Sequence, residues 1–190
     1  MADAFPAQAL RIATAAFLCV VMAGCAGVPG DSGSSAPPPL AASRGGPGRI
    51  ETPPAPLQCV PYARAHSGIS IYGDAGTWWN QATNKYARHQ QPEPGAVMVL
   101  IGYAGPKRGH LAVVQKIVSP RLILVDHANW LNSGDIYLSN AVADVSPAND
   151  WSVVRVYNLR ADSWGIRDYP VQGFIGPEPA QMRLAGQVSE

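Results

Sequence analysis

The sequence has no excess of either charge and few cysteines. Its 190 residues include 14 Lys and Arg against 13 Asp and Glu. No stretch interleaves basic with aromatic residues, so we expect no nucleic-acid partner. The only cysteines are Cys19, Cys25 and Cys59. The length suits a single folded domain with appendages.

The N-terminal apolar run, "IATAAFLCVVMAGC" (12–25), is too short to span a bilayer. Its length suits the core of a signal peptide, which we predict over residues 1–24. Small residues stand directly before Cys25, and this ending resembles the lipobox of bacterial lipoproteins. The resemblance implies that Cys25 is acylated and becomes the mature N-terminus. An ordinary signal peptide is the alternative.

The lipobox resemblance also implies an exported, lipid-anchored protein at the cell envelope. Ala26 follows Cys25 in place of the Asp associated with inner-membrane retention, so we expect the periplasmic face of the outer membrane. Cys19 would leave with the signal peptide, and Cys59 would be the one thiol of the folded part. A lone thiol in an oxidising compartment is either buried and inert or kept for its reactivity.

Residues 25–56 consist mainly of Gly, Pro, Ser and Ala. Such a segment buries too little apolar surface to fold and is predicted to be a tether. The folded domain is expected over residues 57–176, followed by an irregular tail over 177–190.

Helices precede an antiparallel sheet in the predicted domain, which is typical of an α+β fold. "QCVPYARAHSG" (58–68) predicts a helix, because Pro61 fits its first turn and Gly68 its C-terminal cap. "AGTWWNQATNKYA" (75–87) predicts a second helix. Apolar runs predict strands over 96–101, 110–118, 121–128 and 151–159, with a hairpin at Ser119–Pro120.

Cys59 and His110 are the residues best placed for nucleophilic chemistry. A thiol in the first turn of a helix faces unpaired N–H groups, which favour the thiolate and can stabilise an oxyanion. His110 follows a loop and opens a strand, where it could take the proton from Cys59. Taken alone, each residue has a structural alternative: a small buried thiol and a solvated histidine.

Together, "QCVPYAR" at a helix start and "GHLAVVQ" at a strand start resemble the CHAP family of cysteine, histidine-dependent amidohydrolases/peptidases. "PEPGAVMV" and "ANW" add to the resemblance, which covers roughly residues 57–160. It implies a papain-like cysteine hydrolase fold, with N-terminal helices packed on a small antiparallel β-sheet. It also implies that Cys59 is the nucleophile, that His110 is the general base, and that the substrate is the peptide part of peptidoglycan.

The third position departs from the family pattern. CHAP sequences usually have a Glu two residues before an Asn, whereas here His127 precedes Asn129. NlpC-type cell-wall peptidases, a neighbouring papain-like group, commonly use a second histidine there. The third group need only accept a hydrogen bond from the catalytic imidazole and hold its ring.

Alternation of side chains along a strand separates these candidates. His127 and Asn129 share one face, and Asp126 points to the other. A two-residue loop at Ser119–Pro120 would set His110 opposite Asn129, and a four-residue loop over 117–120 would set it opposite His127. Both loops exclude Asp126, although an odd-length loop or a bulge would reverse this. We rank His127 first, Asn129 second and Asp126 third.

Aromatic side chains are weaker candidates. Trp78 and Trp79 could line a substrate groove, although adjacent residues on a helix cannot share one face and either could be core. Trp130 could cover the site, and Tyr62 could hold the oxyanion or only pack. No short ligand spacing predicts a metal, and we expect no cofactor.

The leading hypothesis is cysteine-dependent hydrolysis of peptidoglycan peptides by a monomeric amidase or endopeptidase. A second is a non-catalytic envelope lipoprotein that binds peptidoglycan or a protein partner through the same fold. A third is a cysteine protease or secreted toxin-like hydrolase acting on proteins, although the lipobox argues against free secretion. The sequence does not indicate which peptidoglycan bond would be cleaved.

The parity argument predicts that His127→Ala lowers the rate of peptidoglycan hydrolysis more than Asp126→Ala does, because only His127 shares a face with His110. Turnover by the two variants, measured side by side, tests the ranking. A larger loss in Asp126→Ala would contradict it.

Overall fold

The computed structural model describes residues 48–105 and 108–176. The predicted signal peptide, the lipidation site at Cys25 and the predicted tail over 177–190 lie outside these residues. The predicted tether lies outside them except for its last nine positions. Those positions include a short strand, β1 (Arg49–Glu51), which pairs with a later strand, so regular structure begins before the predicted boundary at residue 57.

The first predicted helix is present, and the second is much shorter than predicted. α1 (Cys59–Ser67) ends at Gly68, whose φ of 71° is the left-handed conformation of a glycine C-cap. In place of a helix over 75–87 there is a 3-10 turn, η1 (Ala75–Thr77), followed by one helical turn, α2 (Trp78–Gln81). Asn84 then adopts a φ of 60°, which a right-handed helix cannot contain.

The predicted strands are present, and the structure contains others that the sequence did not reveal. Besides β1 there are seven strands and a 3-10 turn, η2 (Trp130–Asn132). The strands are β2 (Arg88–His89), β3 (Val97–Leu100), β4 (His110–Ser119), β5 (Leu122–Ala128), β6 (Ile136–Asp144), β7 (Val153–Asn158) and β8 (Ser163–Ile175).

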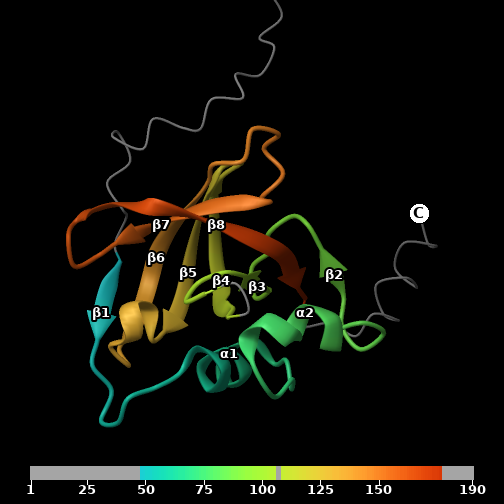
Figure 1. Ribbon diagram of the computed structural model, residues 1–190, viewed down its shortest axis with the longest axis horizontal. Coiled ribbons are helices and arrows are strands. Elements are labelled where there is room, and N and C mark those ends of the chain that lie inside the picture. Colours follow the sequence, from blue (N-terminus) through green and yellow to red (C-terminus); the bar gives the residue numbers. More distant parts are fainter. Residues whose placement is uncertain (1–47, 106–107, 177–190) are drawn as a thin grey trace, which may run out of the picture. The chain divides into compact units, whose positions relative to one another are not determined.

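The sheet closes into an antiparallel barrel, visible in Figure 1. Strands follow the order β6-β5-β4-β3-β8, and β7 completes the ring by pairing with both β6 and β8. The predicted α+β papain-like fold, with N-terminal helices on a small sheet, is therefore wrong. The described chain is mostly a closed β-barrel with two short helices.

The sequence of strand β8 explains why a closed barrel was not predicted. Its sequence, "SWGIRDYPVQGFI", contains proline and two glycines, which are typical of turns rather than strand interiors. Pro170 marks the point where β8 changes partner: Pro170 is opposite Val153 of β7, and Val171 is opposite Leu100 of β3. A strand that bends between two neighbours in this way closes a barrel.

Alternate residues of β3 and β4 pack into two different hydrophobic clusters. Met98 of β3 and Val114 of β4 belong to the cluster inside the barrel. Val99 and Leu111, on the opposite faces of the same strands, pack with Trp78 beneath the helices. Since His110 and Val114 have the same parity on β4, the His110 side chain points toward the barrel interior.

Near the site, β4 and β5 pair in the register that a two-residue loop at Ser119–Pro120 would produce. The turn itself lies elsewhere. Ser119 is paired with Leu122, so the loop is Pro120–Arg121. Two register shifts along the hairpin then bring Val113 opposite Asp126. Each shift changes the pairing by one residue, and the two together restore the predicted parity.

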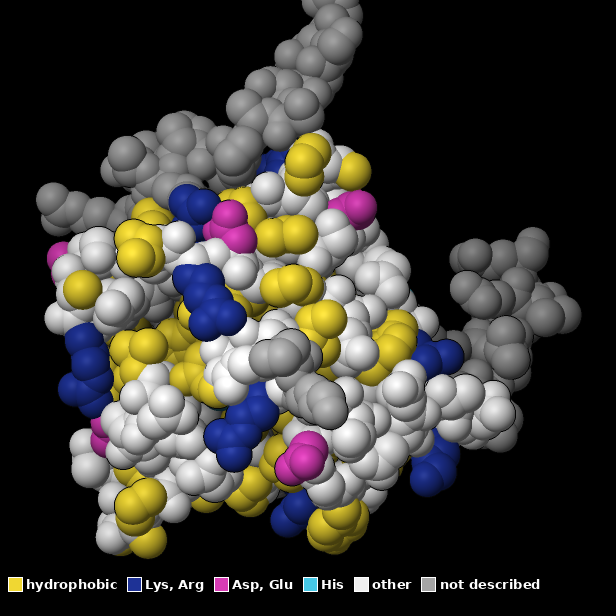
Figure 2. Space-filling view, in the orientation of Figure 1, with side chains coloured by type: hydrophobic (Ala, Val, Ile, Leu, Met, Phe, Trp, Pro, Cys, Tyr) yellow, Lys and Arg dark blue, Asp and Glu magenta, His cyan; other side chains and the backbone are white. Residues whose placement is uncertain are grey.

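No helix within residues 48–105 and 108–176 is long and apolar enough to cross a membrane. On the face shown in Figure 2, arginine and lysine side chains of the described residues are scattered among hydrophobic ones and form no continuous stripe.

Gly109 allows the helical region to approach the start of β4. A Cβ at this position would lie 2.6 Å from the backbone N of Gly76 and 2.8 Å from the carbonyl O of Leu100. We expect Gly109→Ala to lower the free energy of unfolding by about 1–3 kcal/mol, because two backbone segments would have to separate. Urea denaturation measures this change.

Gly176→Ala is the matched control, since its Cβ would meet a side-chain atom, the Cβ of Ala87, at 3.3 Å. A loss in Gly109→Ala no larger than in this control would contradict the steric argument.

Candidate active site

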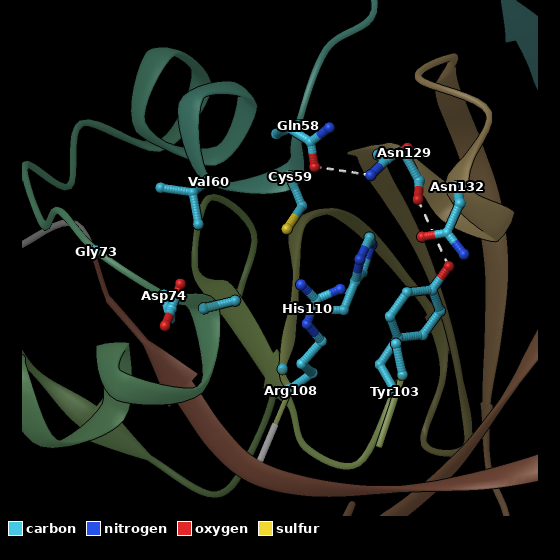
Figure 3. Close-up of a pocket in the computed structure, with 13 residues that line it drawn as sticks. Gln58, Cys59, Val60, Gly73, Asp74, Tyr103, Arg108, His110, Asn129 and Asn132 are labelled. Carbon is cyan, nitrogen blue, oxygen red and sulfur yellow. Dashed lines mark hydrogen bonds between the residues drawn. The ribbon is translucent and has the colours of Figure 1, made fainter. Parts of the chain in front are cut away.

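A pocket of about 370 Å³ lies at the N-terminus of α1 and brings Cys59, His110 and Asn129 together (Figure 3). Four segments distant in sequence form its walls. They contribute Gln58, Cys59 and Val60; Gly73, Asp74 and Ala75; Tyr103, Ala104, Arg108, Gly109 and His110; and Asn129 and Asn132.

Cys59 is the first residue of α1 and a free, half-buried thiol. Its sulfur points into the pocket, toward the wall that carries His110 (Figure 3). Burial raises the pKa of the Cys59 thiol, although backbone N–H groups of Leu111, Val60 and Cys59 itself act in the opposite direction. The expectation that the helix start would favour the thiolate is therefore wrong: desolvation is the larger effect.

His110 and His127 form a direct hydrogen bond. Nε2 of His110 lies 2.8 Å from Nδ1 of His127, and both side chains are 1% exposed. The contact leaves Nδ1 of His110 as the ring nitrogen available to Cys59. The structure thus brings the predicted base and the predicted orienting residue into contact.

Aromatic rings hold the two histidines in place. The Trp130 ring centroid is 4.9 Å from that of His110 and 5.2 Å from that of His127. Tyr103 packs on His110 at 4.9 Å and on Trp130 at 4.6 Å. Trp130 is 3% exposed and does not line the pocket, so it supports the histidines from behind instead of forming a groove wall.

The protein environment keeps both histidines neutral. Burial, followed by the neighbouring His127, holds the pKa of His110 well below its ordinary value of 6.5. Burial alone lowers the pKa of His127 to about 3. With the Cys59 pKa raised as well, the resting site is a thiol beside two neutral imidazoles.

Asn129 connects the end of β5 to the start of α1. Its Nδ2 donates to Oε1 of Gln58 over 2.8 Å, and its Oδ1 accepts from the backbone N–H of Gly134 over 2.9 Å. Asn129 adopts a φ of 62°, which asparagine tolerates better than most residues. Its side chain therefore positions Gln58, next to the predicted nucleophile.

Asp126 lies on the opposite face of β5 from His127. One of its carboxylate oxygens accepts from the backbone N–H of Ser139 over 2.6 Å. Burial raises the pKa of this carboxyl, while the bond from Ser139 lowers it. Its hydrogen bonding is therefore directed at β6 and not at His110.

The remaining predicted residues do not line the pocket. Tyr62 is buried and stacked on His66, with ring centroids 4.0 Å apart. Trp78 is fully buried in the cluster beneath the helices. Trp79 packs against Arg88 and Gly173.

Polar pocket residues that the sequence did not single out are Gln58, Asp74, Tyr103, Arg108 and Asn132. Gln58 could have been suspected, because it directly precedes Cys59. The others are distant from Cys59 in sequence and approach it only through the tertiary fold. Within the described residues, no group of three or more His, Cys, Asp or Glu side chains could hold a metal ion.

Residues 51–129 match the family model of the CHAP domain. Over these residues the chain is similar to the CHAP domain. This confirms the resemblance expected from "QCVPYAR" and "GHLAVVQ", and CHAP is a papain-like cysteine/histidine amidohydrolase domain.

The matched segment contains Cys59, His110, His127 and Asn129 and ends before β6. Comparison with curated proteins and comparison with solved structures each gave no match. The CHAP domain indicates a hydrolase with a peptidoglycan-related substrate.

The buried histidines predict a stability that falls in acid. In the unfolded chain both titrate near 6.5, whereas in the folded protein their pKa values are depressed. The unfolded state therefore binds more protons below pH 6.5, and unfolding becomes more favourable as the pH falls toward about 3. Each histidine contributes a slope of up to about 1.4 kcal/mol per pH unit in this range.

Urea denaturation between pH 7 and pH 5 measures this slope. His127→Gln should flatten it because one titrating group is removed. His66→Gln, which replaces a histidine at an exposed position, is the comparison variant. An equal slope in His127→Gln and the unsubstituted chain would contradict the assignment.

Proposed function

We propose that this protein hydrolyses amide bonds in peptidoglycan peptides, as a cysteine amidase or endopeptidase at the cell envelope. The observation that carries the proposal is the convergence of Cys59 and His110 in one pocket, with His127 bonded to the far nitrogen of His110. The CHAP match supports the reaction class and the kind of substrate.

The first step is attack of Cys59 Sγ on the amide carbonyl carbon. Because both groups rest in their neutral forms, Nδ1 of His110 takes the thiol proton as the carbon–sulfur bond forms. His127 accepts from Nε2–H of His110 and stabilises the imidazolium that results. No preformed thiolate is required.

The negative charge that develops on the carbonyl oxygen needs hydrogen-bond donors. The backbone N–H groups at the start of α1, which already approach the sulfur, lie where such donors are required. Gln58 is held beside them by Asn129, which occupies its Oε1 and leaves its amide nitrogen as a possible donor. This assignment takes the place of the one made for Tyr62.

The intermediate then collapses. The carbon–nitrogen bond breaks, and Nδ1 of His110 gives its proton to the leaving amine. Water, deprotonated by His110, attacks the thioester, and the acid product leaves as Cys59 recovers its proton. Atoms and charge balance without a cofactor.

The polar lining of the pocket suits a charged peptide. Arg108 and Asp74 stand on separate walls, and the Arg108 side chain points into the pocket (Figure 3). Carboxylates and amines of a peptide could pair with these two groups. The pocket therefore favours a peptide over an apolar substrate.

The same proposal places the protein at the periplasmic face of the outer membrane, held by lipid on Cys25. Its support is the apolar run before Cys25 and the small residues "MAG" that precede this cysteine. The Gly- and Pro-rich segment that follows would give the domain reach from the membrane toward the cell wall.

One observation favours the alternative, a non-catalytic CHAP-like module that binds peptidoglycan or a protein partner. Burial raises the pKa of Cys59, and a thiol with a raised pKa is a poor nucleophile without its base. The two functions differ in whether Cys59 is needed for bond cleavage.

Digestion of purified peptidoglycan, with fragments identified by mass, tests the proposal. The unsubstituted protein should release peptide fragments whose new ends name the bond cleaved. Cys59→Ala should lower turnover by on the order of 10⁴-fold or more, because Cys59 is the only thiol among the described residues that line the site. Its denaturation midpoint should change little, since the substitution removes one half-buried sulfur.

Equal fragment release by Cys59→Ala would refute thiol catalysis. Peptidoglycan binding by both proteins, with no fragments from either, would establish the non-catalytic module instead.

A further inference from the structure

Asn140 lies directly behind His127, outside the segment that matches the CHAP family model. It is a β6 residue with no exposed surface. Its side-chain Nδ2 is placed 3.0 Å from Nε2 of His127. His110, His127 and Asn140 therefore form a continuous buried chain of hydrogen bonds that starts at the Cys59 pocket.

A β-bulge turns Asn140 toward the barrel interior. Val125 is paired with Asn140 and His127 with Tyr137, so two residues of β6, Leu138 and Ser139, lie opposite the single residue Asp126. Ser139 adopts a φ of 50°, and its N–H is bonded to Asp126. Without the extra residue, alternation from Tyr137 would point Asn140 out of the barrel.

The proton positions along this chain depend on which amide atom faces His127. For Nδ1 of His110 to accept the Cys59 proton, Nε2 of His110 must carry hydrogen and donate to Nδ1 of His127. His127 then carries its own hydrogen on Nε2 and needs an acceptor there. The amide oxygen of Asn140 can accept this hydrogen, whereas its NH₂ group cannot.

The opposite orientation would disable the base. If Nδ2 of Asn140 donates to Nε2 of His127, then His127 carries its hydrogen on Nδ1 and donates to Nε2 of His110. The hydrogen of neutral His110 is then on Nδ1, facing Cys59, where a bare nitrogen is required.

Counting hydrogen bonds does not distinguish the two orientations. With Nδ2 toward His127, Oδ1 of Asn140 is buried and has no partner in the described part of the chain. Rotation of the amide about its last bond exchanges the atoms and keeps one bond to His127. Amide oxygen and nitrogen are assigned from the network that they must satisfy, and here the chemistry of His110 supplies the criterion.

We infer that Asn140 is a positioning residue whose Oδ1 accepts from Nε2–H of His127 and so fixes the tautomers of both histidines for catalysis. The inference rests on the proposed function of Cys59 and His110 for its purpose. Its geometry stands on the contact between Asn140 and His127, and Asn140 acts through His127 without touching the substrate.

Nitrogen-15 NMR of histidine-labelled protein near neutral pH measures the tautomers directly. We expect both buried rings to carry hydrogen on Nε2. His66→Gln and His89→Gln identify the signals of the two other histidines. Hydrogen on Nδ1 of His127 in the folded protein would overturn the inference, whatever the enzymatic activity.

Two substitutions test whether Asn140 accepts a hydrogen bond from His127 or donates one to it. Asn140→Asp places an oxygen in either orientation, so the tautomers should persist. Asn140→Ala removes the acceptor, so the His127 signals should show a mixture of tautomers. Turnover of peptidoglycan should fall about 10-fold in Asn140→Ala through kcat with KM unchanged, as for other residues that orient a catalytic histidine. Retained tautomers and kcat in Asn140→Ala would overturn the inference.

Val142→Ala is the matched control for lost packing, since Val142 is equally buried on the same strand. It should lower stability and leave the tautomers unchanged. If the buried charge of Asn140→Asp prevents folding, the unsubstituted protein and Asn140→Ala still decide the question.

The inference and the proposed function fail in different ways. Expected tautomers with no peptidoglycan cleavage would refute the proposed enzyme and leave the role of Asn140 in setting tautomers intact. Cleavage that depends on Cys59, with hydrogen on Nδ1 of His127, would refute the inference and leave the proposed enzyme intact.

Discussion

The hydrogen bond between His110 and His127 is the contact on which the arrangement of the site depends. It joins the first residue of β4 to the penultimate residue of β5, and it uses Nε2 of His110, which leaves Nδ1 for Cys59. Closure of the barrel buries it, and Trp130 and Tyr103 fix the ring planes. Because burial excludes water, the charged form of either imidazole is disfavoured, and the pair meets the pocket at His110.

Local patterns predicted the elements that carry Cys59 and His110 better than they predicted the fold. Cys59 does begin a helix that ends at Gly68, and His110 does begin a strand, because caps and alternation act over a few residues. The route of β8 depends on which strands lie beside it, and nothing in "SWGIRDYPVQGFI" specifies a partner. The α+β prediction therefore failed at the long-range pairing that closes the ring.

Of the β4–β5 hairpin, the parity of the side chains was predicted correctly, whereas two registers were left open and the turn lies one residue later than expected. Alternation requires only that the number of register shifts be even, and two shifts occur. The same reasoning could not place Asn140, because a single shift in β6 reverses its direction. In the same way, the pKa of the Cys59 thiol was predicted from the helix start alone. Burial of Cys59 has the larger effect and raises this pKa.

Asp126, excluded from contact with the histidines, has a different part in the architecture. Its carboxylate holds Ser139 in the bulge, and the bulge turns the next side chain inward. Deletion of one residue at 138–139 is compatible with the strand order of the barrel. It would, however, point the Asn140 amide out of the barrel instead of into it. A one-residue deletion in a relative of this chain would thus mark a lineage in which the fold persists while the histidine pair needs a new acceptor.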